Sequence, residues 1–224
     1  MSTKKEWISL AIVFSGSILG LLGVLAFNKY ILMSLPLIVR MVAMIAAYYL
    51  ICVIPIIVMK KSGDKFSDYG FTKEKAALQV VTGIGLGLAL SLIFTLLPHL
   101  IGMGEWVNNG KHYQHLWQFA YDFLYYIAAV ACVEEFVFRG ILYKKLNRVT
   151  KNQIAAVAIS SVLFGLFHLL GGNIIQVVTT AILGIILCAF RLKIKNCSTL
   201  SLIIAHGVYD AMITVWNAVF LNAN

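Results

Sequence analysis

The sequence predicts an all-α membrane protein, a polytopic bundle of about seven transmembrane helices. Of the 224 residues, 61% are hydrophobic and 12% are charged, whereas an ordinary soluble domain carries about 25% charged residues. The charges are also bunched between long apolar runs, so they cannot form the polar surface of a soluble globule. We therefore expect a multi-pass protein of the cell membrane whose outer surface faces the lipid bilayer.

Seven apolar runs approach the roughly 20 residues that a helix needs to cross about 30 Å of hydrocarbon. In order along the chain they are Trp7 to Phe27, Pro36 to Met59, Ala76 to Leu97, Trp117 to Gly140, Ile154 to Leu170, Ile174 to Phe190 and Thr199 to Leu221. The first run is too long for a signal peptide and lacks the small residues of a cleavage site, so we treat it as a true span.

Glycines give further structural expectations. Gly171, Gly172 and Asn173 separate the fifth and sixth runs and predict a tight turn between two helices. Pairs of small residues four apart, such as Gly16 with Gly20, allow two membrane helices to approach closely.

No duplication or linker divides the chain. We expect a single membrane-embedded domain over residues 1–224, in which 1–116 form the amino-terminal helices and 117–221 form the core that carries the polar motifs.

Lys and Arg residues set the orientation, because cytoplasmic loops carry an excess of them. One side of the membrane receives Lys4, Lys5, Lys60, Lys61, Lys65, Lys73, Lys75, Lys144, Lys145, Arg148, Lys151, Arg191, Lys193 and Lys195. The other side receives only Lys29, Arg40 and Lys111, which places the amino terminus in the cytoplasm. The basic stretches are not interleaved with exposed aromatic residues, so a nucleic-acid partner is not expected.

Ionisable residues inside the predicted spans indicate a functional site, because each costs a few kcal/mol in hydrocarbon and usually faces an interior cavity. They are Glu134, Glu135 and Arg139 in the fourth span, His168 in the fifth, and His206 with Asp210 in the seventh. Asp122 lies near the outer end of the fourth span, where we interpret it as structural.

Helical geometry separates the two neighbouring acids. At 100° per residue, Glu135 shares a face with Arg139 at the i, i+4 spacing of ion pairs. Glu134 points about 100° away from Glu135, toward another surface of the helix. One acid is thus neutralised by Arg139, and the other is available to face a cavity and to act in general acid/base chemistry.

A hairpin centred on Lys151 brings Glu134 and His168 to similar heights, since each lies 17 residues from that turn. His206 lies about 12 Å into its own helix and Glu134 about 15 Å from Lys144, by the 1.5 Å rise per residue. A carboxylate and two imidazoles around one cavity can bind a metal, relay protons or activate water against an amide.

With these residues in view, the sequence resembles the CPBP family of intramembrane proteases, also called the Abi or CAAX-protease family. The resemblance rests on Glu134-Glu135-x-x-x-Arg139, Phe164-x-x-x-His168 and His206-x-x-x-Asp210, in that order. It covers roughly the second half of the chain and implies an all-helical membrane enzyme that hydrolyses a peptide bond.

In the scheme that the resemblance implies, Glu134 with His168 activates the attacking water, and His206 with Asp210 stabilises the oxyanion. An ionised Asp cannot donate to an oxyanion. Asp210 must therefore be kept protonated, or accept from His206 and fix its orientation.

Three further residues of the motifs are supporting rather than catalytic in this scheme. Glu135 and Arg139 match the supporting acid and arginine of the family. Phe164, one helical turn before His168, is the third.

The need for a metal stays open at this point. We expect metal-free glutamate catalysis with no cofactor, because the His-Glu-x-x-His string of zincins is absent from the sequence. The alternative is a metalloprotease in which zinc binds Glu134, His168 and His206, with water in the fourth position. His112 and His115 in the outer loop are interpreted as solvated residues.

The expected substrate is a peptide or protein in the membrane, lipidated or not. Lys greatly outnumbers Arg, as in AT-rich bacterial genomes, which favours peptide maturation or bacteriocin self-immunity over the maturation of prenylated proteins. The alternative function is non-enzymatic, a proton-coupled carrier or a partner-binding scaffold that uses the same acids and histidines as a relay. Carriers of that kind commonly show two related halves, and the sequence shows no such duplication.

Overall fold

A computed structural model describes residues 3–170, 172 and 174–221. Within these residues the chain is helical and contains no strand, so the predicted all-α class is confirmed. The α-helices are α1 (Thr3–Tyr30), α2 (Leu37–Tyr48), α3 (Leu50–Lys61), α4 (Ala76–Ser91), α5 (Leu97–Leu100), α6 (Leu116–Tyr125), α7 (Cys132–Glu134), α8 (Tyr143–Thr150), α9 (Gln153–Phe167), α10 (Ile174–Lys193) and α11 (Thr199–Leu221).

In the described residues, three short π-helical segments interrupt the regular helices. They are Leu92–Leu96, Tyr126–Ala131 and Glu135–Leu142. A π-helix uses i→i+5 hydrogen bonds, is rare, and occurs frequently at functional sites. Two of the three segments lie on either side of α7, which ends at Glu134.

Six helices in the described part of the chain are long and apolar enough to cross a membrane. They cover Lys4–Tyr30, Leu37–Lys61, Ala76–Leu100, Gln153–Leu170, Ile174–Lys193 and Thr199–Phe220. These match six of the seven predicted spans to within a few residues, and the protein is a multi-pass membrane protein.

The predicted fourth span, 117–140, is also helical but is not among those six. Asp122, Glu134, Glu135 and Arg139 lie within it and make it the least apolar of the seven runs. The turn predicted at Gly171, Gly172 and Asn173 lies largely outside the described residues.

The chain divides into two compact units. The first consists of Met1–Thr72 and Val133–Thr199, and the second of Lys73–Cys132 and Leu200–Asn224. Each unit combines a segment from the amino-terminal half with one from the carboxy-terminal half. The single domain expected over 1–224 stays a prediction.

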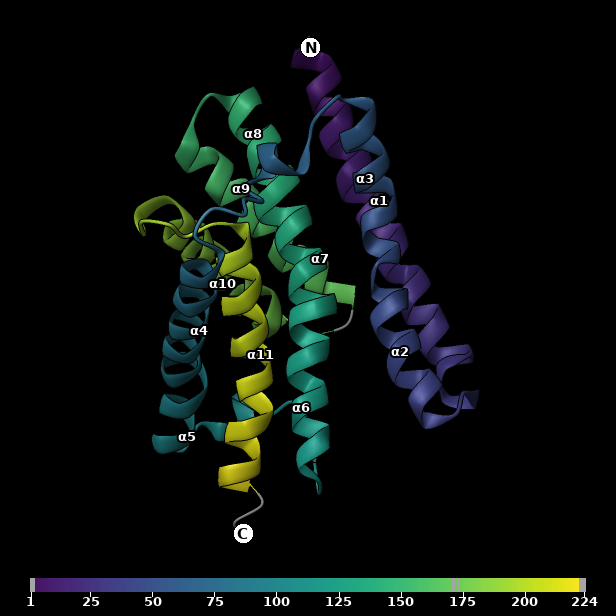
Figure 1. The fold of residues 1–224 in the computed structure, drawn as a ribbon, viewed down its shortest axis with the longest axis vertical. Coiled ribbons are helices and arrows are strands. Elements are labelled where there is room, and N and C mark those ends of the chain that lie inside the picture. Colours follow the sequence, from purple (N-terminus) through teal and green to yellow (C-terminus); the bar gives the residue numbers. More distant parts are fainter. Residues whose placement is uncertain (1–2, 171, 173, 222–224) are drawn as a thin grey trace. The chain divides into compact units, whose positions relative to one another are not determined.

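In the first unit, α1 lies alongside α3, and α9 packs against both α8 and α10 (Figure 1). A Cβ atom on Gly20 would lie 2.5 Å from the Cα atom of Ile51, and one on Gly16 would lie 2.4 Å from the side chain of Ile54. Both distances are far below van der Waals contact, so α1 and α3 can only approach this closely because these positions are glycine.

In the second unit, a pair of glycines on α4 likewise allows this helix to approach α11 closely. A Cβ atom on Gly83 would lie 2.7 Å from the carbonyl oxygen of Ser201, and one on Gly87 would lie 2.6 Å from that of Ala205. Glycine pairs four residues apart therefore set a close helix contact in each unit.

Candidate active site

Glu134 and Glu135 are buried at the junction between α7 and the π-helical segment Glu135–Leu142. The two acids point in different directions, as the helical geometry predicted. Each has a different set of partners, which together define the site.

Glu135 pairs with Arg139. The Nη1 atom of Arg139 lies 2.9 Å from Oε1 of Glu135, and both side chains are at most 1% exposed. The guanidinium group also lies over the ring of Phe164, 4.0 Å from its centroid, in a cation–π contact. The predicted i, i+4 pair is thus present, and Phe164 supports it from α9.

Arg191 of α10 donates hydrogen bonds to the π-helical segment that contains Arg139 and to a neighbouring loop. Its Nη1 atom donates to the carbonyl oxygen of Arg139 at 2.5 Å, and its Nη2 atom donates to the carbonyl oxygen of Tyr69 at 3.2 Å. From the sequence, Arg191 is expected only to add to the positive charge on one side of the membrane. The structure shows that its guanidinium group ties α10 to the π-helical segment and to the loop before α4.

The hairpin between α8 and α9 positions His168 relative to Glu134. Lys151 adopts a left-handed conformation, with φ of 52°, and ends α8. The side chain of Asn152 then caps α9 by accepting from the backbone N–H groups of Ile154 and Ala155. The turn therefore lies where the sequence placed its centre.

His168 is the C-cap of α9. Its backbone N–H points to the carbonyl oxygens of Gly165 and Leu166, and its ring Nδ1 lies 2.9 Å from the carbonyl oxygen of Phe164. A carbonyl can only accept, so Nδ1 carries the proton in this contact. In the neutral ring, Nε2 then presents a lone pair.

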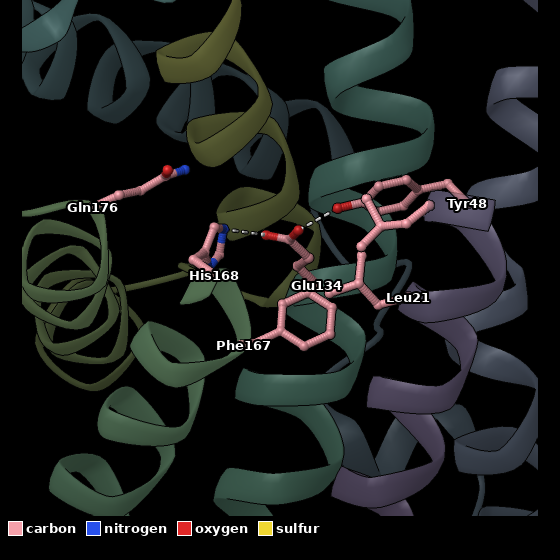
Figure 2. A pocket seen from close by; sticks show the side chains of 7 residues that line it. Leu21, Tyr48, Glu134, Phe167, His168 and Gln176 are labelled. Carbon is pink, nitrogen blue, oxygen red and sulfur yellow. Dashed lines mark hydrogen bonds and ion pairs between the residues drawn. The ribbon is translucent and has the colours of Figure 1, made fainter. Parts of the chain in front are cut away.

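Glu134 and His168 face each other in a pocket of about 110 Å³ (Figure 2). The Nε2 atom of His168 lies 3.9 Å from Oε2 of Glu134, and the hydroxyl of Tyr48 donates to Oε1 of Glu134 at 2.5 Å. The pocket is lined by Leu21, Leu25, Tyr48, Glu134, Phe167, His168 and Gln176, all of which belong to the first unit. The structure therefore confirms the prediction that the side chains of Glu134 and His168 lie close together.

A distance of 3.9 Å is too long for a direct hydrogen bond and is suited to a bridging water. An ionised Glu134 accepts only, and so does Nε2 of the neutral ring of His168. A water between them donates one O–H to each, which leaves its oxygen lone pairs available. This arrangement is chemically suited to general-base activation of water.

Residues 116–212 match the family model described as Type II CAAX prenyl endopeptidase Rce1-like. This stretch contains all three motifs. This part of the chain is similar to the CAAX protease family. Searches of curated proteins and of solved structures found no match to the chain.

The described family is one of endopeptidases, and the match covers the carboxy-terminal helices of the chain. The matched stretch begins at the start of α6 and ends within α11. It therefore leaves out Leu21, Leu25 and Tyr48, which line the pocket from α1 and α2.

The third motif, His206-x-x-x-Asp210, lies in the second unit. On α11, His206 and Asp210 share one face, and Nε2 of His206 lies 3.4 Å from Oδ2 of Asp210. The predicted i, i+4 relationship within this motif is thus present. The role of the pair in catalysis stays a prediction.

A zinc site at Glu134, His168 and His206 is the alternative that the sequence leaves open. Within the described residues, no three His, Cys, Asp or Glu side chains gather closely enough to hold a metal ion. Glu134 and His168 supply two ligand types that zinc accepts, and a zinc site would need a third protein ligand beside them.

Proposed function

We propose that the protein is a glutamate-type intramembrane endopeptidase in which Glu134 and His168 activate the water that attacks a peptide bond. The observation that carries this proposal is the position of the two side chains, which line one pocket with Oε2 of Glu134 and Nε2 of His168 3.9 Å apart, so that one water in the pocket can contact both atoms. The family match supports the reaction class.

In the proposed reaction, Oε2 of Glu134 takes a proton from the water, and the water oxygen bonds to the carbonyl carbon of the substrate. Glu134 then returns this proton to the amide nitrogen as the C–N bond breaks, which yields a carboxylic acid and an amine. His168 orients the water through Nε2, and its own ring is fixed through Nδ1 by the carbonyl of Phe164.

His206 and Asp210 are proposed to stabilise the oxyanion that forms in this reaction. The 3.4 Å contact within the pair supports Asp210 as an acceptor that orients the ring of His206. In that role Asp210 stays ionised and does not itself donate to the oxyanion.

The biological substrate is proposed to be a peptide processed in a bacterial membrane, in the maturation of a peptide signal or in bacteriocin self-immunity. The excess of Lys over Arg supports a bacterial origin. Under this proposal the substrate does not need a prenyl group, and cleavage proceeds on an unlipidated membrane peptide.

The test uses the purified full chain in liposomes with two quenched fluorescent peptides of the same CAAX sequence, one farnesylated and one not. Glu134→Gln and His168→Ala are each expected to lower the cleavage rate by about 10²-fold or more, the usual contribution of an acid/base group. Glu105→Gln and His115→Ala, which change the same residue types in the exposed outer loop, are the matched controls.

Two outcomes would overturn the assignment. Cleavage at the wild-type rate by both Glu134→Gln and His168→Ala would exclude the proposed chemistry. Loss of cleavage after exhaustive chelation, with recovery on addition of zinc, would replace the metal-free mechanism with a metal-dependent one.

A further inference from the structure

Tyr48 is an additional component of the pocket, and it lies far outside the stretch that matches the family. It is the last residue of α2, 86 positions before Glu134, and its hydroxyl donates to Oε1 of Glu134 at 2.5 Å. Figure 2 shows the phenol on one side of the carboxylate and the imidazole of His168 on the other. The phenol contacts Oε1 of Glu134, and the imidazole faces Oε2.

The local fold places the phenol there. The α2 helix ends at Tyr48, and Tyr49 forms the turn into α3, with its N–H directed to the carbonyl oxygens of Ala46 and Ala47. The Gly20 contact brings α1 close to the beginning of α3, since a Cβ on Gly20 would also lie 2.6 Å from the carbonyl oxygen of Leu50. The backbone on both sides of this turn is thus held by close helix packing.

The carboxylate of a glutamate keeps one orientation only when a hydrogen bond holds one of its oxygen atoms. Its terminal torsion has a broad energy minimum, so an unanchored group samples many orientations. A donor on Oε1 fixes that torsion and leaves Oε2 directed at His168. Because a water must touch Oε2 and Nε2 at once, the orientation of the carboxylate decides whether that water is held correctly.

We infer that Tyr48 is a positioning residue for the proposed hydrolysis, which holds Oε1 of Glu134 so that Oε2 faces the water and His168. This inference rests on the proposed function. It assigns to the amino-terminal spans a direct part in the active site, through a side chain that the carboxy-terminal motifs do not contain.

The first test is Tyr48→Phe, which removes the hydroxyl and keeps the ring that lines the pocket. We expect kcat to fall by about 10-fold to 100-fold, the usual cost of losing one hydrogen bond to a charged group. KM is expected to stay within about twofold because the walls of the pocket are unchanged. Tyr49→Phe makes the same chemical change at the next, exposed position and is expected to leave both constants unchanged.

The second test does not depend on activity. The infrared difference between wild-type protein and Glu134→Gln isolates the carboxylate stretching band of Glu134. Tyr48→Phe is expected to shift this band, because the hydrogen bond to Oε1 is lost, and Tyr49→Phe is expected to leave it in place.

The outcomes separate this inference from the function on which it rests. A shifted band together with a lower kcat supports the positioning role. A shifted band with unchanged kcat, or an unshifted band, overturns it while leaving the hydrolase in place if Glu134→Gln is inactive. Full activity of Glu134→Gln would instead overturn the proposed function itself, and the positioning role with it.

Discussion

The guanidinium group of Arg139 lies 2.9 Å from the carboxylate of Glu135, and both side chains are buried. The preceding carboxylate, that of Glu134, faces the pocket instead. Glu135 therefore belongs to a structural ion pair, whereas Glu134 is available for the proposed chemistry. Substitutions in the ion pair should lower stability, and substitutions of Glu134 should lower activity.

Replacing Arg139 by Met should destabilise the protein strongly. The carboxylate of Glu135 would stay buried without its cation, which costs about 3–5 kcal/mol. Thermal unfolding in detergent micelles, followed by circular dichroism, measures this loss. The matched control is Arg148→Met, because Arg148 is 38% exposed and its ion pairs contribute about 1 kcal/mol or less. Equal stability of the two variants would contradict a structural role for the buried pair.

Replacing Gly20 by Ala should separate α1 from α3. The new methyl group would lie 2.5 Å from the Cα atom of Ile51, so the helices must move apart, at a cost of about 1–3 kcal/mol. Gly23→Ala is the matched control on the same helix, since its methyl group would meet its nearest neighbour at 3.8 Å. The midpoint of thermal unfolding should fall for the first variant and stay within error for the second.

Asp64, in the loop after α3, should make stability depend on pH. Burial alone acts to raise the pKa of its carboxyl group, but the Tyr69 hydroxyl, Arg148 and Lys145 outweigh burial and hold that pKa below 3.8. The hydroxyl lies 2.6 Å from Oδ2, and the same burial and hydrogen bond raise the pKa of Tyr69, which stays protonated as the donor.

Because the pKa of Asp64 is lower in the folded state than in the unfolded state, its contribution is present above pH 3.8. It is lost as the pH falls through the folded value. Asp64→Asn should therefore be less stable than wild type by about 1–2 kcal/mol at pH 7, with the difference shrinking below pH 4. Thermal midpoints recorded from pH 3 to pH 7 measure it, with Glu105→Gln as the control. A difference that did not change with pH would contradict the ionic origin.

Asp122 should hold in place the loop before α6, which contains Lys111 and Tyr113. It accepts from Nζ of Lys111 at 2.9 Å, from the Tyr113 hydroxyl at 2.8 Å and from the Thr214 hydroxyl at 2.9 Å. These contacts support the interpretation of Asp122 as a structural residue. In Asp122→Ala protein in detergent micelles, trypsin should cleave after Lys111 faster than in wild type, because local opening of the loop becomes easier. Glu105→Ala is the control and is expected to leave the cleavage rate unchanged. An unchanged rate in Asp122→Ala would contradict the prediction, because it would show that the other contacts of the loop are enough to keep it closed.

The sequence predicted the parts of the site that depend on spacing along a helix or across a hairpin. The i, i+4 pairs of Glu135 with Arg139 and of His206 with Asp210 follow from 100° per residue. The meeting of Glu134 with His168 follows from their equal separation from Lys151, where the structure indeed places the turn.

Tyr48 and Arg191 were not predicted, because their contacts cross long sequence separations without a local signal. A tyrosine in an apolar run is typical of any membrane helix, and only the helix packing at Gly20 brings its hydroxyl toward Glu134. The π-helical segments were also missed. They depend on backbone hydrogen bonds that the pattern of side chains does not reveal.

The pocket is assembled from distant portions of the chain, and this has a consequence during biosynthesis. Leu21, Leu25 and Tyr48 leave the ribosome first, whereas His168 and Gln176 are translated more than a hundred codons later. The pocket therefore cannot be complete before Gln176 has been translated, and under the proposed chemistry no peptide bond can be attacked there until then.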